Sequence, residues 1–276
     1  MIRTMIYTGA ALWAAGLTCF AQDAQRANVP LSDPSRPAVV HASLMNGGIT
    51  VTGYNGKEVI VEARPRHDHE HERESKPDPK AQGMHRLETR GTGLTVEEQD
   101  NEVNIGVGMM NRTMDLNIQV PFNTSLKLRC MNDGDIKVEH VNGEVDVDDL
   151  NGGVKLLNIS GVVVAHSLNA DVVVTMDQVT PGKSMSFSTM NGDVDVTMPP
   201  DLKARVKMKS DNGEVYSDFD VHIDAAASTP ETSDTHRKDG RYRLHFDKAT
   251  YGIINGGGPE MQFTTFNGKI YLRKKK

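Results

Sequence analysis

Three histidines in one short segment are the side chains best suited to hold a metal ion. His67, His69 and His71 alternate with acidic residues, so an extended chain would place the three imidazoles on one side. Neutral imidazole is a good ligand for Zn and Cu. The neighbouring residues are rich in Pro, Glu and Lys, a composition typical of a solvated loop. We therefore expect either weak capture of Zn or Cu or a charged loop that binds no cofactor.

Cys130 is the second residue type that could do chemistry, because His140 and His166 occur in neighbouring repeats of the sequence. A histidine beside a cysteine can lower the pKa of the thiol and make it a nucleophile. Structural cysteines are far more common, and no base is evident next to this one. We expect Cys130 to be structural.

Two pairs of aspartates lie at strand spacing, Asp146 with Asp148 and Asp193 with Asp195. A calcium site needs about six to eight oxygen atoms around one point. A glycosidase needs two carboxylates in a cleft, with the pKa of one of them raised. The sequence shows neither arrangement, so we expect these carboxylates to point to solvent and favour solubility.

Whole-sequence features exclude several functional classes. The sequence has no Gly-x-Ser-x-Gly elbow, no Walker loop and no Gly-x-Gly-x-x-Gly turn, so we assign no catalytic residue and expect no enzyme activity. The formal net charge is −6, and the only basic cluster lies at the C-terminus. Nucleic acid is therefore excluded as a partner, since its phosphates require a basic surface.

The N-terminus is typical of a secretory leader. Arg3 precedes an apolar run that is too short to span a bilayer, and Ala21 is a suitable cleavage site. We expect a signal peptide over 1–21, a flexible proline-containing tether over 22–37 and no transmembrane segment after cleavage. Lipidation at Cys19 is the alternative, but the residues before it do not form a lipobox. The protein is expected to be exported, to the periplasm or the cell surface.

The main organising feature of the sequence is a short repeat with Asn-Gly or a close variant at its turn. The spacing is nine residues in the centre, and apolar residues alternate with polar ones after each turn, which predicts strands with one buried face. The turns that show it are Asn46-Gly47, Asn55-Gly56, Asn132-Asp133-Gly134, Asn142-Gly143, Asn151-Gly152, Ser160-Gly161, Asn169-Ala170, Asn191-Gly192, Asn212-Gly213, Asn255-Gly256 and Asn267-Gly268.

Asn-Gly turns are also typical of antiparallel hairpins, so a β meander is the alternative fold. Hairpin pairing would set nearly every apolar side chain opposite a polar one, which is unfavourable. A parallel β-solenoid with about two repeats in each coil avoids this, because it stacks Val154 between Ile136 and Val172. We therefore predict an all-β solenoid over 38–276, with Asn and Gly in left-handed corner conformations. Two polar segments, 64–86 and 224–241, are expected to be loops outside the stack.

The sequence resembles the bacterial putative-adhesin family of exported β-strand-repeat proteins. The resemblance covers roughly Leu94 to Leu272 and is carried by Leu116–Pro121, Ser125–Val138, Phe187–Val196 and the segment from Asn255 to Leu272. It implies export and a β-helical stack, and it supplies no catalytic motif. The insertion at 64–86 departs from the pattern.

Taken together, these observations favour a non-enzymatic binding or structural module of the cell envelope. Its partner would be an envelope protein or polymer, bound through a solenoid face or a loop. A self-assembling envelope scaffold is the alternative, because open solenoid ends can stack. The tether and the Lys274–Lys276 end are expected to block such stacking, which predicts a monomer.

Overall fold

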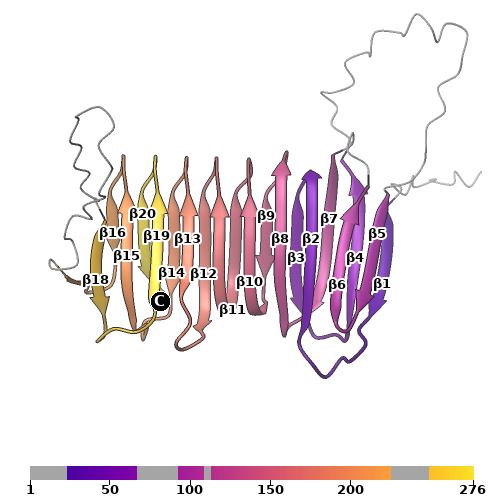
Figure 1. Cartoon of the computed structure of the whole chain (residues 1–276), viewed down its shortest axis with the longest axis horizontal. Coiled ribbons are helices and arrows are strands. Elements are labelled where there is room, and N and C mark those ends of the chain that lie inside the picture. The colour runs from indigo at the N-terminus through magenta and orange to yellow at the C-terminus, as the bar shows by residue number, and fades with distance from the viewer. Residues whose placement is uncertain (1–23, 67–92, 109–112, 225–248) are drawn as a thin grey trace, which may run out of the picture.

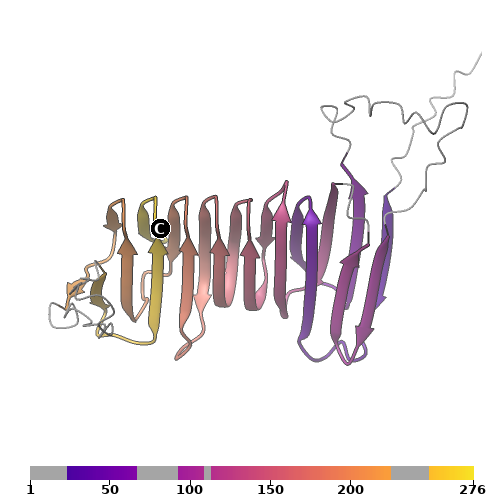
Figure 2. The same ribbon diagram turned by 45° about the horizontal axis from the view of Figure 1, so that its top comes forward.

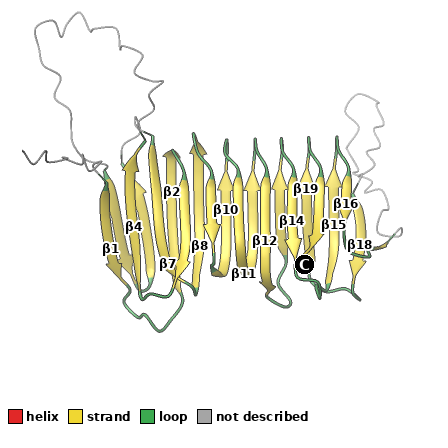
Figure 3. Ribbon diagram, turned by 180° about the vertical axis from the view of Figure 1, so that it is seen from behind, coloured by secondary structure: helices red, strands yellow, loops and turns green. Residues whose placement is uncertain are grey.

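The strands of this chain lie side by side in one long stack with two faces (Figure 1). The structure is a computed structural model that describes residues 24–66, 93–108, 113–224 and 249–276. The expected signal peptide, the three histidines and nearly all of both expected loops lie outside these residues. The described residues consist of strands and turns (Figure 3), so the predicted all-β class is confirmed.

One face of the stack, called face A here, is a continuous ladder of strands. In spatial order these are β5 (Leu94–Gln99), β6 (Glu102–Val107), β2 (Ala38–Asn46), β8 (Thr124–Asn132), β10 (Asn142–Asp149), the second half of β11 (Val154–Ser167), β13 (Met185–Thr189), β19 (Glu260–Thr265), β15 (Ala204–Ser210), β18 (Thr250–Ile254) and β17 (His222–Ile223).

The opposite face, face B, is the second ladder (Figure 2). Its strands are β1 (Gln25–Pro30), β4 (Glu58–Pro65), β7 (Met114–Pro121), β3 (Ile49–Tyr54), β9 (Ile136–Glu139), the first part of β11, β12 (Val172–Val179), β14 (Val194–Met198), β20 (Ile270–Lys274) and β16 (Val215–Ser217).

Parallel pairing between equivalent repeats builds the centre of the stack. Val154 pairs with Ile136 on one side and with Val172 on the other, as the solenoid prediction required. All three of these side chains are buried, whereas Lys155, the residue after Val154, is exposed. Apolar residues thus stack on apolar residues from coil to coil, and the inward side chains of both faces form one core.

The coils do not follow chain order at the two ends. The coil made by β2 and β3 lies between β6–β7 and β8–β9, and the coil made by β19 and β20 lies between β13–β14 and β15–β16. Figure 1 shows both as strands whose colour breaks the gradient, indigo among magenta and yellow among orange. The β2–β3 and β19–β20 coils are therefore built into the interior of the stack.

This arrangement corrects two expectations. In the tether expected over 22–37, the described residues 24–37 are not simply flexible, because β1 pairs antiparallel with β4 and Leu31 is buried. The Lys274–Lys276 end does not cover an end of the stack, because β20 pairs with β14 and β16 inside it. One end is instead formed by antiparallel pairs on both faces, β1 with β4 and β5 with β6. At the other end face A finishes in the antiparallel strands β15, β18 and β17, and face B finishes in β16, which pairs parallel with β20.

Glycine at the corners is required by close stacking more often than by a left-handed backbone. A Cβ at Gly152 would lie 1.9 Å from the carbonyl oxygen of Gly134 in the next coil, and that contact is too short for any side chain. Asp133 (φ 62) and Asn255 (φ 48) do have a positive φ at their corners, but Asn151 and Asn191 do not. The expected left-handed corners are therefore wrong for those positions, and the turn depends on side-chain hydrogen bonds instead.

Candidate functional site

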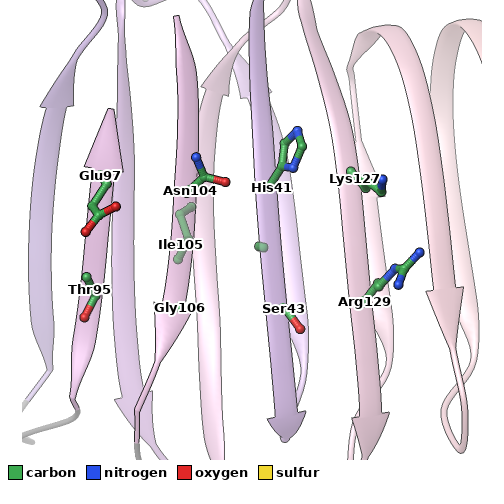
Figure 4. A pocket seen from close by; sticks show the side chains of 10 residues that line it. His41, Ser43, Thr95, Glu97, Asn104, Ile105, Gly106, Lys127 and Arg129 are labelled. Atoms are coloured by element: carbon green, nitrogen blue, oxygen red, sulfur yellow. The ribbon is translucent and has the colours of Figure 1, made fainter. Parts of the chain in front are cut away.

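A hollow on face A lies where β5, β6, β2 and β8 run side by side (Figure 4). Its volume is about 460 Å³, and we call it the face A trough. The strands that form it come from three separate stretches of the sequence. Outward side chains line it because successive residues of a strand point to opposite faces, and the inward ones belong to the core.

Strand register arranges the trough residues in two parallel rows. In each row the four residues are cross-strand neighbours, so their side chains lie about 5 Å apart along the ladder. From β5 to β8 the rows span three strand spacings, roughly 14 Å. The first row is Glu97, Asn104, His41 and Lys127, and the second is Thr95, Gly106, Ser43 and Arg129.

The second row has two small residues at its middle, Gly106 and Ser43. A Cβ added at Gly106 would meet no other atom within 4 Å, so the space above β6 is open. Ser43 beside it carries only a hydroxyl group. The trough therefore has a polar floor that a ligand can approach closely, and a side chain at Gly106 would fill part of it.

Charge is distributed unevenly along the trough. Lys127 and Arg129 are exposed at the β8 end, and Glu97 lies at the β5 end. His41 lies between them, with its Nε2 3.6 Å from a carboxylate oxygen of Glu102. At the β8 end the trough can thus bind a negatively charged group of a ligand, and at the β5 end Glu97 can accept hydrogen bonds from a ligand. Amide and hydroxyl groups of the protein lie between the two ends.

A ladder of asparagine side chains runs along the corner between the two faces. Each Nδ2 donates to the Oδ1 of the asparagine in the next coil, at 2.8 to 3.3 Å. The ladder stabilises the corner and fixes the register of the strands that meet there. In spatial order its members are Asn46, Asn132, Asn151, Asn169, Asn191, Asn267 and Asn212.

A second, inward row lies two residues before each ladder asparagine. Ser167 donates its hydroxyl to the carbonyl of Gly152 at 2.9 Å, and Thr189 donates to Ala170 at 2.7 Å. Thr265 and Ser210 do the same toward the next coils. In these four coils the position therefore holds a hydrogen-bond donor for the corner carbonyl that it faces, whereas Leu44 holds it in the coil of Asn46.

Asp149 occupies this donor position with a carboxyl group. It is fully buried, its Oδ1 accepts from the amide of Gly152 at 2.8 Å, and its Oδ2 has no hydrogen-bond partner in the structure. Burial raises the pKa of Asp149 to about 6, and the charges of Asp135 and Asp148 act in the same direction, against the backbone amides of Gly152 and Asn151. Only the protonated form could donate from Oδ2 as the hydroxyls of the neighbouring coils do.

Cys130 holds the equivalent place in the preceding coil. Its thiol donates to the carbonyl of Gly47 with a sulfur to oxygen distance of 2.8 Å. Burial, and then the nearby Asp149 carboxylate, raise the pKa of Cys130 to about 12. His166 points outward and contacts Ser188 instead, and His140 contacts Asn158 at another corner. The thiol is therefore a structural donor rather than a nucleophile.

The predicted aspartate pairs point outward, but two of the four have structural partners. Asp193 accepts from the amide of Lys269 at 2.7 Å, and Asp195 binds Arg273 through two hydrogen bonds. Asp146 and Asp148 lie opposite Lys127 and Arg129 in register. Within the described ranges no group of three or more His, Cys, Asp or Glu residues is placed to hold a metal ion.

Sequence reasoning did not find the face A trough. His41, Glu97 and Lys127 look like ordinary outward residues of separate repeats, and the solenoid prediction placed coils in chain order. Only the insertion of β2 between β6 and β8 brings them together. The single sequence signal was Gly106, a glycine inside a strand, which often marks a place where something approaches the backbone.

The fold defines an all-β protein of parallel stacked coils with a polar trough on one face. Residues 126–245 match the family model described as Toastrack DUF4097. This match to the family model confirms the resemblance to the putative-adhesin family that the sequence indicated. No curated protein matches the chain significantly. Among the described residues, no helix is long and apolar enough to cross a membrane.

Two solved structures are similar to this chain. A putative cell adhesion protein from Clostridium sporogenes has 13% sequence identity and a TM-score of 0.47, over 91% of this chain and 100% of that one. A putative adhesin from Bacteroides fragilis has 10% identity and a TM-score of 0.32, over 92% of this chain and 98% of that one. The architecture given above rests on the strand pairing of this chain itself.

Proposed function

We propose that this protein is a non-enzymatic binding module of the bacterial cell envelope, and that the face A trough holds a short extended segment of an acidic envelope protein. The observation that carries the proposal is the pair of registered rows, which run from Glu97 and Thr95 to Lys127 and Arg129. Their length of roughly 14 Å fits about four residues of extended peptide. Asn104 and Ser43 would hydrogen-bond its amide groups, and the two cations would bind its carboxylates.

Two features favour peptide binding over sugar binding and over catalysis. No aromatic side chain lines the trough to stack on a sugar ring. Asp149 and Cys130, whose pKa values are raised furthest in the described chain, lie inside the stack and outside the trough. Active sites are usually places where a cleft and perturbed pKa values coincide, and here they are apart.

The antiparallel edge strands favour a binding module over a self-assembling scaffold. Stacking end to end would continue the parallel ladders of both faces. Of the four edge strands, β1, β5 and β17 pair antiparallel with their neighbours, and β16 on face B pairs parallel. The three antiparallel edges do not match a second copy of the parallel coil. Export, and a place in the periplasm or on the cell surface, follow from the leader expected at 1–21.

The test uses the chain without its leader and two synthetic tetrapeptides that differ only in having Asp and Glu or Asn and Gln. We expect the acidic peptide to bind weakly and to shift amide resonances of β2, β6 and β8, with affinity falling as salt rises. The variant K127E/R129E should lose binding at least tenfold. The matched control K207E/K209E changes the same charges on β15 of face A and should bind normally.

Equal binding by K127E/R129E and wild type would rule out the trough. Preference for an acidic oligosaccharide over the acidic peptide would retain the trough and reject the peptide as its ligand.

A further inference from the structure

A second hollow lies on face B, behind the same β2–β3 coil. It has a volume of about 420 Å³ and is formed by β7, β3, β9 and β11. One registered row crosses it, made by Asn117, Thr50, Lys137 and Lys155. Gly48, Asp115 and Asp135 line the hollow on the side nearer the asparagine corner.

The row contains two lysines directly opposite each other. Lys137 on β9 and Lys155 on β11 are cross-strand partners in a parallel ladder. Like charges in this relation destabilise a sheet, so such a pair calls for an anion to compensate it. Glu139 compensates Lys137, with a distance of 2.8 Å between its carboxylate and the ammonium group, and this hydrogen bond lowers the pKa of Glu139. Among the residues that the structure describes, no carboxylate forms an ion pair with Lys155.

The carboxylates nearest the hollow already serve other groups. Asp115 accepts from the amide of Gly48 at 3.1 Å and binds the guanidinium of Arg66. Asp135 accepts from the amide of Gly153 at 2.8 Å. Arg64 is paired with Glu62 at 2.7 Å. The charge of Glu139 acts on Lys155 as well as on Lys137, but Glu139 forms its ion pair with Lys137, so within the described chain the ammonium group of Lys155 lines the hollow with no carboxylate in an ion pair with it.

We propose that this hollow on face B binds a phosphate group, with Lys155 and Lys137 as its cations and Thr50 and Asn117 as neutral hydrogen-bond donors. Ammonium groups make charge-assisted hydrogen bonds to phosphate oxygens, and a doubly charged anion would remove the repulsion between the two lysines. The site is separate from the face A trough, since its side chains point to the opposite side of the stack. Its ligand can be free phosphate or the phosphate of a lipid headgroup.

The test measures the melting temperature and amide resonances of the leaderless chain with added inorganic phosphate, against sodium chloride at equal ionic strength. We expect phosphate, and not chloride, to raise the melting temperature and to shift resonances of β3, β9 and β11. K155Q and K137Q should each weaken phosphate binding about tenfold. K155Q should melt no lower than wild type in phosphate-free buffer, because it removes the like-charge pair.

The control K207Q lies on face A and should respond to phosphate as wild type does, as should K127E/R129E. Vesicles that contain phosphatidic acid distinguish the two sources: binding that K155Q abolishes indicates a headgroup, and a response to inorganic phosphate alone indicates the free anion. An identical response to chloride, an undiminished response in both lysine variants, or no response to phosphate would each overturn the proposal.

Discussion

The central coils and the outer coils of this stack obey the same pairing rule with different connectivity. From β9 to β12 each coil lies beside the next one in the chain, and inward apolar residues repeat 18 positions apart, as from Ile136 to Val154 and on to Val172. Towards the ends, a coil from a distant part of the chain is inserted between two coils that follow each other in sequence. Both hollows lie over the inserted β2–β3 coil. Regular stacking of coils in chain order thus builds a stable core. Insertion of a coil out of chain order brings together side chains of different kinds from distant parts of the sequence.

The largest expected effect tests whether the inserted C-terminal coil is part of the core. Deleting 270–276 removes the buried Ile270 and Leu272 and leaves β14 and β16 without their shared partner. We expect loss of the cooperative unfolding transition, measured by circular dichroism during heating. Deleting only Lys275 and Lys276 should change the melting temperature little, because the Lys275–Asp177 pair is largely exposed. Similar melting of both truncated chains would show that β20 is dispensable.

The second prediction concerns the regular centre. V154D places a carboxylate without a partner in the stacked core and should reduce the free energy of unfolding by about 4 kcal/mol or more. K155D changes an exposed side chain beside it and should be nearly neutral. Denaturant titration of both variants measures the difference, and equal losses would contradict the assignment of the two faces.

The third prediction concerns Asp149, which places a carboxyl group where neighbouring coils place a hydroxyl donor. The folded pKa of Asp149 is about 6 and its usual value is 3.8, so the folded chain binds the proton more tightly. The stability that this proton contributes is complete below about pH 4 and is lost as pH rises through about 6. D149N supplies a permanent donor, so it should stabilise the protein by about 1 to 3 kcal/mol at pH 8 and very little at pH 4.

Denaturant titrations across this pH range provide the measurement for D149N. S167A, which removes a hydroxyl donor that does not titrate in this range, should cost about 1 kcal/mol at every pH. A wild-type protein that is as stable at pH 8 as at pH 5, with no gain in D149N, would show that Asp149 Oδ2 is not held as an acid.

The smallest expected effect compares the middle and the end of the asparagine ladder. Asn169 both donates to Asn151 and accepts from Asn191, whereas Asn212 only donates to Asn267. N169A should therefore cost about 1 kcal/mol and N212A about half of that, measured by chemical denaturation. A larger loss in N212A would mean that the end of the stack depends on the ladder more than its centre does.

The sequence predicted the centre of the fold well and the candidate sites poorly. Alternation and the nine-residue spacing predicted the partners of Val154 and Leu156, because stacking of like side chains is a local consequence of the repeat. The same logic could not place β2 or β19, whose partners depend on which gap in the stack their side chains fill. The trough residues His41 and Lys127 were missed for that reason. His67, His69 and His71 lie outside the described residues, and weak metal capture there stays a prediction.

By itself, the sequence determined the strand period, the corner asparagines and glycines and the buried apolar positions, since each follows from the geometry of a few consecutive residues. The tertiary structure decided the spatial order of the coils, the pairing of the edge strands and the two registered rows that line the hollows. It also decided that Asp149 lies where its neighbours place hydroxyl donors. These features depend on contacts between residues far apart in the chain, and the free energy of those contacts is not encoded in any one repeat.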